Sequence, residues 1–465
     1  MTEKKKINGF TLVMLIVTTS IGAGIFALSS DLAHAAAQGP ALIAWLIIGI
    51  GVILLAATFN NLLIKCPTLN GIFTYGKKGF GDFAGFISGW GYWMSCWLGN
   101  IAISTIFMST LGYFFPIFSK SNSIYSIIGA SICSWLLIFM VSLGIENAAF
   151  VDSIITICKL IPIIVFIIAS ILVFKVNFFS QHFWGNLANS FNFSSTVVQV
   201  KNCFMTMMWL FVGIEGATVL AARAKSKKIA GRSTLIGVVA LLIIYVLASI
   251  LPYGYFTRAQ LINAPQPPMA YLLEKIVGPW GGLLISVGVL ISIIGTWISW
   301  TILPSETMCA MAKEKLLPKK LGETNKFGAP IYALITTGVM VQLFLISLLF
   351  TNKAYEFAYS LSTASVIITY IIVASYQIKL SSQEKNKRQL FIGIGTLIFE
   401  TVGILFAGLK YLLVCTIIYI PGLYLYYLAV RKRRKLTTLE KIGMLVIVMI
   451  GIAAIWMLLS KKITI

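Results

Sequence analysis

Thirteen apolar runs divide the chain, and they restrict its fold more than any other feature. A helix that crosses a bilayer needs about 20 consecutive apolar residues, and each run is of roughly that length. The sequence therefore predicts an all-α polytopic membrane protein of 12 or 13 spans. The runs lie at about 10–30, 41–64, 84–115, 124–144, 153–174, 200–222, 232–255, 281–303, 330–350, 355–377, 390–408, 411–430 and 442–459.

The composition excludes a soluble globule. Of 465 residues, 58% are apolar and 11% are charged, whereas about 25% charged residues is typical of soluble domains. The net charge of +22 would indicate nucleic acid in a soluble protein, but these basic residues lie in short blocks between apolar runs. We predict no nucleic-acid partner. The seven cysteines form no CxxC pair and the two histidines are far apart, so no disulfide framework, metal or cofactor is predicted.

The basic residues also predict the orientation of the chain in the membrane. If the N-terminus is cytoplasmic, 26 of the 36 Lys and Arg residues fall on the inner side and nine on the outer side. Cytoplasmic loops carry such an excess, so we expect a plasma-membrane protein with its N-terminus in the cytoplasm. The blocks 223–232 and 431–435 are expected to fix this topology and to contact anionic lipids.

The sequence favours a carrier over an enzyme, a pump or a channel. Residues 71–77 match the opening of a phosphate-binding loop, but Lys78 replaces the Ser or Thr that would meet magnesium. Acidic residues are scattered singly and form no catalytic constellation. We also find neither a repeated filter loop nor rings of charge, as a channel would require.

Two spans carry paired glycines in mid-membrane. Gly22 and Gly24 interrupt the first span, and Gly213 and Gly216 interrupt the sixth. They open the first and second sets of five spans, which is typical of inverted-repeat transporters whose substrate binds at broken helices. Unwound amides can bind a carboxylate, and freed carbonyls can bind an ammonium group. We therefore predict an α-amino acid substrate. The alternative is that these glycines only allow close helix packing.

At these residues the chain resembles the amino acid, polyamine and organocation transporter superfamily. Within it, the sequence is similar to basic amino acid exchangers, most of all to arginine/ornithine antiporters and more distantly to arginine/agmatine antiporters. The resemblance covers about residues 8–430. The stretches that carry it are IGAGIF at 21–26, GWGYWMSCWLGN at 89–100, FVGIEGA at 211–217, RAK at 223–225, IVGPWG at 276–281 and AKEKLLP at 312–318.

The resemblance implies a LeuT-like core of two inverted repeats of five spans, followed by two or three extra helices. Repeat one would cover about 8–175 and repeat two about 198–378. Helices 11 and 12 would follow at about 389–430, and a basic loop with a thirteenth helix would occupy 431–465. A homodimer is an open alternative to a single chain.

The function implied is exchange of a basic amino acid, arginine or lysine, for ornithine or a related amine by alternating access. Proton-coupled amino acid uptake is an alternative. Another is exchange of a different pair, such as histidine for histamine, because the stretch around Glu306 departs from the pattern of arginine exchangers. A membrane sensor that binds an amino acid without moving it is the alternative from another class.

The resemblance also assigns roles in the two breaks. Ala23 and Gly24 would present amides to the substrate carboxylate, with Ser20 and Gly22 in the same binding segment. Carbonyls near Trp209 and Val212 would accept the α-amino group. Trp209 also resembles the gate residue that closes over bound substrate.

Spans 3 and 8 supply the residues expected to bind the substrate side chain. Trp300 aligns best with a tryptophan that stacks on the cationic end, a contact worth about 2 kcal/mol when desolvated. Trp297, one turn earlier, is the competing choice. Ser95, Cys96 and Asn100 would line the side-chain pocket, although Ser95 and Cys96 also suit simple helix packing.

Two ionisable residues fall well inside spans, where a charge costs at least about 2.5 kcal/mol. Glu215 directly follows the second break, and in similar exchangers a Glu at this place acts as a proton sensor or coupling residue. Lys159 resembles a lysine that sodium-independent members place where relatives bind sodium. The alternative for Lys159 is a lysine paired with a carbonyl that never titrates.

Overall fold

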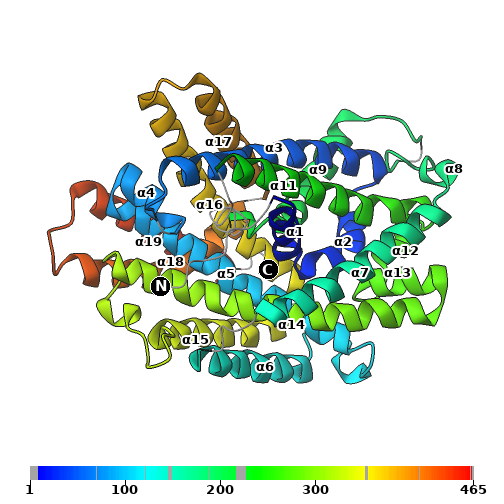
Figure 1. Cartoon of the computed structure of the whole chain (residues 1–465), viewed down its shortest axis with the longest axis horizontal. Helices are drawn as coiled ribbons and strands as arrows, with labels where there is room; N and C mark the ends of the chain where they lie inside the picture. Colours follow the sequence, from blue (N-terminus) through cyan, green and yellow to red (C-terminus); the bar gives the residue numbers. More distant parts are fainter. Residues whose placement is uncertain are drawn as a thin grey trace. The chain divides into compact units, whose positions relative to one another are not determined.

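The computed structural model describes residues 9–69, 71–120, 122–144, 149–186, 188–215, 227–350, 354–407, 409–460 and 462. Across these residues it contains helices, turns and loops, and no strand (Figure 1). The prediction of an all-α polytopic protein is therefore confirmed. Residues 216–226, which include the end of the sixth apolar run and the RAK stretch at 223–225, lie outside the described part.

Ten helices in the described part are long and apolar enough to cross a membrane. Each coincides with one of the predicted runs. They are α3 (Gln38–Lys65), α5 (Asp82–Leu111), α6 (Ile124–Ser142), α11 (Lys227–Ile250), α14 (Pro279–Lys313), α15 (Ile331–Ser347), α16 (Ala354–Gln383), α17 (Lys387–Ala407), α18 (Leu409–Val430) and α19 (Thr438–Leu459).

Three further predicted runs form other helices. The fifth run is α7 (Ala149–Val173), which contains Pro162. The first run is split into α1 (Gly9–Ser20), the short 3-10 helix η1 (Ala23–Phe26) and α2 (Leu28–Ala35). The sixth begins with α9 (Phe193–Trp209), which ends in mid-run. The predicted breaks in the first and sixth spans are thus present in the backbone.

The chain divides into two compact units, each drawing on several segments. One unit comprises residues 1–65, 105–121 and 148–296, and the other comprises 66–104, 122–147 and 297–465. Helices α5 and α14 contribute residues to both units. This division does not follow the order of the chain, and the repeat boundaries expected from the resemblance remain a prediction.

In the first unit, α11 packs against both α1 and α3, and α3 packs against α9. Short helices complete this unit: α8 (Val176–Phe179), η3 (Leu251–Gly254), α12 (Arg258–Ile262) and α13 (Pro268–Val277). The indole of Trp45 on α3 donates a hydrogen bond to the Ser249 hydroxyl on α11 at 3.0 Å. Helix α3 follows the first break and α11 follows the second. These two spans are therefore held together by helix packing and by a polar contact.

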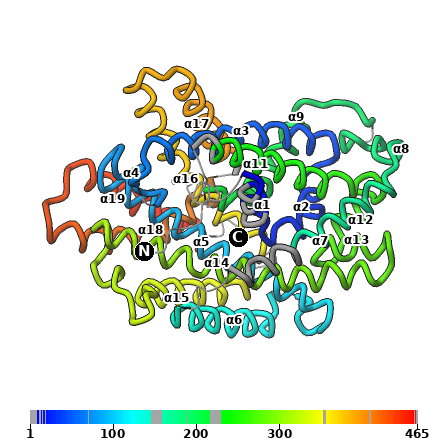
Figure 2. The backbone as a smooth tube through the Cα atoms, in the orientation of Figure 1, coloured from blue at the N-terminus to red at the C-terminus, as the bar shows by residue number. Residues whose placement is uncertain are grey.

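In the second unit, α6 and α15 run alongside each other (Figures 1 and 2). Trp135 on α6 donates to the Gln342 side chain on α15 at 3.0 Å, and Gln342 donates to Ser131 at 3.0 Å. Helix α16 packs against α4 (Phe73–Phe80), α17 and α18, and α18 packs against α19. A capping box of Thr437 and Glu440 fixes the start of α19.

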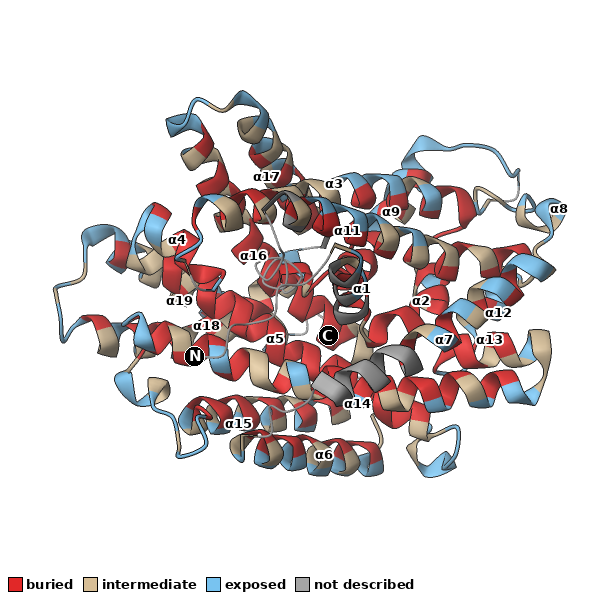
Figure 3. Cartoon of the chain, in the orientation of Figure 1, coloured by how far each residue is buried: buried red, intermediate tan, exposed pale blue. Residues whose placement is uncertain are grey.

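Burial separates the spans into covered and peripheral ones (Figure 3). In the most apolar stretch of 18 residues in α5, 94% is buried inside the structure. In the equivalent stretch of α19, 11% is buried. Large apolar side chains of α19, including Leu445, Met449 and Ile452, are exposed. An apolar helix of this kind has to be covered by lipid or by another chain, so the thirteenth run has the properties of a membrane span.

Candidate functional site

The first helix break places the start of a new helical turn within the first predicted span. Helix α1 ends at Ser20, Gly22 is extended (φ −100°, ψ −165°), and η1 begins at Ala23. The first amides of a helical turn have no acceptor within that turn, and here they belong to Ala23 and Gly24. These amides are able to bind an anionic group. Ser20 is also buried, and its hydroxyl has no hydrogen-bond partner in the described part of the chain.

The second break follows Trp209. The amide of Val212 donates to the Trp209 carbonyl at 3.2 Å, so the chain leaves the helix through a tight turn. Gly213 then takes φ +103°, a conformation that side chains disfavour. Glu215, two residues later, is buried, with 7% of its surface exposed. Gly216, the other glycine predicted for this break, lies outside the described residues.

The two breaks are packed against each other at Gly24. A methyl group on Gly24 would lie 2.9 Å from Leu210 Cδ2 and 3.0 Å from Trp209 Nε1. Real Cβ atoms show almost no contacts under 3.0 Å, so a side chain at residue 24 would displace the Leu210 methyl group and press on the edge of the Trp209 indole. A methyl group on Gly22 would meet nothing within 4 Å. The structure therefore brings the predicted gate residue to the predicted amide site, within one unit.

Tyr245 connects the carbonyl ends of the two broken helices, and sequence reasoning missed it. Its hydroxyl lies 3.1 Å from the Ser20 carbonyl oxygen and 3.2 Å from the Leu210 carbonyl oxygen. Its ring, 1% exposed, also packs edge-on against Phe211 at 5.3 Å between centroids. The one sequence feature that could have indicated this role is that Tyr245 carries the single hydroxyl group in the otherwise aliphatic stretch 241–247.

Replacing Tyr245 by phenylalanine is expected to lower stability and to slow transport. The ring and its packing on Phe211 are retained, but two buried carbonyls lose their shared donor, which costs about 1–3 kcal/mol. The melting temperature of the purified protein and the initial exchange rate in proteoliposomes measure the two effects. Tyr125→Phe, an exposed tyrosine at the start of α6, is the matched control. Equal behaviour of both variants would remove Tyr245 from the site.

Lys159 on α7 binds the first break directly. Its ammonium group donates to the Ile21 carbonyl at 2.7 Å and to the Thr296 hydroxyl at 3.4 Å. The side chain is 5% exposed. The Ile21 carbonyl lies just beyond the end of α1, so the break frees it to accept this bond. A fixed cation therefore joins α7, the break and α14 in the same unit.

In the other unit, the predicted span 3 residues face α14 and α16. Asn100 donates from Nδ2 to the Trp300 carbonyl at 2.8 Å. The hydroxyls of Ser95 and Ser362 lie 3.0 Å apart, and Ser362 also donates to the Ser95 carbonyl at 2.7 Å. Cys96 is buried, with 1% exposure. The structure thus brings Asn100 and Trp300 together, whereas Ser95 is engaged with α16.

The two candidate tryptophans of α14 differ in burial. Trp297 is 2% exposed, while Trp300 is half-buried. Trp297, Asn100 and Thr301 line a cavity of about 10 Å³. That volume suffices for roughly one water molecule and not for an arginine side chain. Within this unit, the Trp300 indole is the more accessible of the two stacking candidates.

No group of three His, Cys, Asp or Glu residues in the described part of the chain could hold a metal ion. Glu306 is exposed on α14. Glu400 on α17 is fully buried, and neither of its carboxyl oxygens has a hydrogen-bond partner among the described residues. At the first break, the structure places the ammonium group of Lys159 on the Ile21 carbonyl.

Comparison with known proteins places these features in a family. The profile of the amino acid permease family matches residues 7–430. The chain belongs to the amino acid permease family. Membership is also supported by relatives that align along almost their whole length with this permease.

Three of these relatives are named as antiporters. An arginine/ornithine antiporter of Latilactobacillus sakei is 54% identical, with 100% of both chains covered. An arginine/ornithine antiporter of Pseudomonas aeruginosa is 37% identical, with 91% of each chain covered. An arginine/agmatine antiporter of Chlamydia caviae is 35% identical over 99% of this chain and 98% of its own. The suspected membership of the basic amino acid antiporter branch is confirmed.

Proposed function

We propose that this permease exchanges arginine for ornithine across the membrane by alternating access. The names of its full-length relatives support the substrate pair. The observation that carries the proposal is the meeting of the two helix breaks at Gly24 and Trp209, with Lys159 on the first break. Broken helices of this kind are where inverted-repeat transporters bind their substrates.

Each part of the first unit's site has a proposed role. The amides of Ala23 and Gly24 bind the substrate carboxylate, and carbonyls near Trp209 and Val212 accept its α-amino group. Trp209 acts as the gate, because its indole already packs on Gly24. Lys159 fixes the break in place of a metal ion, so the broken segment keeps its shape without sodium.

Residues of the second unit are proposed to determine side-chain specificity. Trp300 stacks on the cationic end of the substrate. The Asn100 side chain positions Trp300 by donating a hydrogen bond to the Trp300 carbonyl. A desolvated cation–π contact of this kind is worth about 2 kcal/mol. Cys96 and Ser95 line the side-chain pocket in this proposal.

The proposed orientation places the N-terminus in the cytoplasm of a plasma-membrane protein, as the distribution of Lys and Arg predicts. The 304–329 and 431–441 loops then face the cytoplasm.

Counterflow in proteoliposomes tests the proposed exchange. Vesicles are loaded with unlabelled ornithine, agmatine, histamine or lysine, and uptake of labelled arginine is measured against empty vesicles. Ornithine-loaded vesicles should give the fastest uptake. Uptake that needs a proton gradient and no internal substrate would instead establish proton-coupled import. Substrate binding without any uptake would make the protein a sensor.

Glu215→Gln is expected to flatten the pH dependence of exchange between about pH 5 and 8. A buried carboxyl group changes its interactions with nearby dipoles when it gains a proton. The glutamine side chain has the shape of the glutamate side chain but cannot gain this proton. Exchange rates across pH, at matched protein levels, compare the variant with the wild type. Glu384→Gln, on an exposed residue at the end of α16, is the control. Profiles of the same shape for wild type and Glu215→Gln would show that another group titrates.

A further inference from the structure

A cavity of about 600 Å³ lies outside the proposed transport site, in the second unit. Its walls come from two chain segments, 312–323 and 428–433, which are the ends of α14 and α18 with the loops that follow. This volume falls in the range of roughly 300–1,000 Å³ found for small-molecule sites.

The lining of this cavity is cationic with an apolar wall. Glu323 is the one carboxylate among the lining residues, and Glu314 in the same loop is paired with Lys77 at 2.6 Å. Leu317 and Leu428 are part of the apolar wall. The six basic lining residues are Lys313, Lys315, Lys319, Arg431, Lys432 and Arg433.

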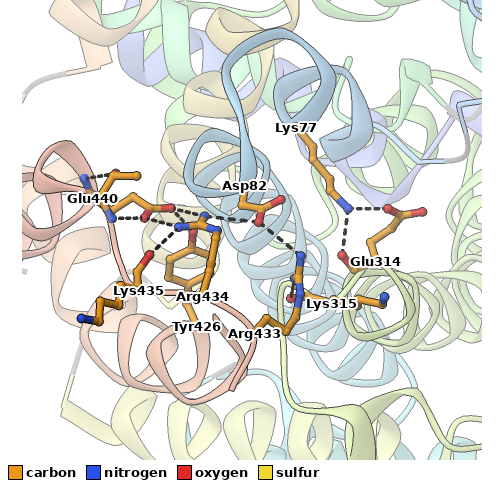
Figure 4. Close-up of polar contacts among 10 residues, drawn as sticks. Lys77, Asp82, Glu314, Lys315, Tyr426, Arg433, Arg434, Lys435 and Glu440 are labelled. Atoms are coloured by element: carbon orange, nitrogen blue, oxygen red, sulfur yellow. Dashed lines mark hydrogen bonds and ion pairs between the residues drawn. The ribbon is translucent and has the colours of Figure 1, made fainter. Parts of the chain in front are cut away.

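Polar contacts hold the two walls together (Figure 4). Arg433 donates from Nη1 to the Lys315 carbonyl at 3.0 Å, and its Nη2 lies 3.7 Å from Asp82 at the start of α5. Arg434 donates to Glu440 at 2.6 Å and lies 3.3 Å from Asp82. Arg434 is therefore held by Asp82 and Glu440. Arg433 links the two wall segments of the cavity to each other and to α5.

Several cations of the cavity have no internal counter-charge. Within the described part of the chain, the ammonium groups of Lys315, Lys319 and Lys432 make no ion pair. Like charges that line the same cavity repel each other, and an anion between them relieves that repulsion. The structure therefore favours an anionic ligand that touches both walls.

The position of the cavity points to the source of that anion. Both wall segments begin where an apolar span ends, α14 at Lys313 and α18 at Val430. Both loops lie on the side that the excess of Lys and Arg predicts to be cytoplasmic. A phospholipid of the inner leaflet carries its phosphate at this level and its acyl chains beside the apolar wall.

We propose that this cavity binds the phosphate group of an anionic phospholipid, with cations from both wall segments around it and the acyl chains against the apolar wall. Inorganic phosphate shares the anionic chemistry but has nothing to place against Leu317 and Leu428. The proposal does not depend on which amino acids the permease exchanges.

Melting temperatures of the full-length protein in detergent test this inference. Palmitoyl-oleoyl phosphatidylglycerol, the corresponding phosphatidylcholine, or inorganic phosphate is added to separate samples, and bound lipid is counted by native mass spectrometry. Phosphatidylglycerol should raise the melting temperature more than the other two. The triple variant Lys315→Gln, Lys319→Gln, Lys432→Gln should lose that difference and retain fewer lipids.

The matched control is Lys326→Gln, Lys385→Gln, Lys387→Gln. It removes the same charge from exposed lysines of loops on the same predicted side, outside the cavity lining, and it should behave as the wild type does. Equal shifts with phosphatidylglycerol and phosphatidylcholine would overturn the proposal. So would an equal shift with inorganic phosphate, which would make the site one for a free anion. A folded triple variant that keeps the phosphatidylglycerol response would also overturn it.

Discussion

Lys159→Met is expected to reduce exchange by about ten- to a hundredfold while the protein still inserts into the membrane. Methionine keeps the length and apolar stem of the side chain but removes the donor to the Ile21 carbonyl, 2.7 Å away. A hydrogen bond to a charged group contributes about 1.5–3 kcal/mol, and about 1.4 kcal/mol corresponds to a tenfold change in an equilibrium constant. The broken segment would therefore lose its bound shape in most molecules.

Initial rates of labelled arginine uptake into ornithine-loaded proteoliposomes, at matched protein levels, measure this effect. Lys175→Met is the matched control, because Lys175 is exposed two residues beyond the end of α7. The wild type should transport equally in sodium and in choline buffers, since the proposed role of the Lys159 ammonium group is to take the place of the ion. A steep sodium requirement in the wild type, or full activity of Lys159→Met, would contradict this role.

The spans and both helix breaks could be predicted because their signals are local. Hydropathy over about 20 residues identifies a membrane helix regardless of what packs on it, and α19 coincides with its predicted run although only 11% of its apolar window is buried. Paired glycines weaken a helix through their own backbone freedom. Hence α1 ends at Ser20, just before Gly22, and α9 ends at Trp209, four residues before Gly213.

The contacts of the site could not be predicted in the same way, because they join residues far apart in the chain. Nothing near Tyr245 in the sequence indicates that its hydroxyl reaches the carbonyls of Ser20 and Leu210. In the sequence, Ser95 suits helix packing and substrate binding equally well, and its bond with Ser362 depends on the placement of α16. Spacing along a helix defines a shared face and does not define the partner on that face.

Gly24→Ala is expected to slow transport about five- to a hundredfold. The added methyl group would lie 2.9 Å from Leu210 Cδ2 and 3.0 Å from Trp209 Nε1, so the Leu210 methyl group has to shift and the indole of the proposed gate has to give by a few tenths of an ångström. Overpacking a buried site costs about 1–3 kcal/mol, and each 1.36 kcal/mol added to a barrier slows the step about tenfold. The maximal exchange rate and the melting temperature of the purified protein measure the two consequences.

Gly22→Ala separates packing from substrate contact. Its methyl group would meet nothing within 4 Å, and its extended backbone suits any residue, so the melting temperature should remain that of the wild type. The same methyl group would project into the open space beside the amides proposed to bind the carboxylate. It should therefore raise the KM for arginine while leaving the maximal rate nearly unchanged. The opposite pattern, with Gly24→Ala affecting only KM and Gly22→Ala only the maximal rate, would show that Trp209 is not the gate and that the carboxylate binds elsewhere.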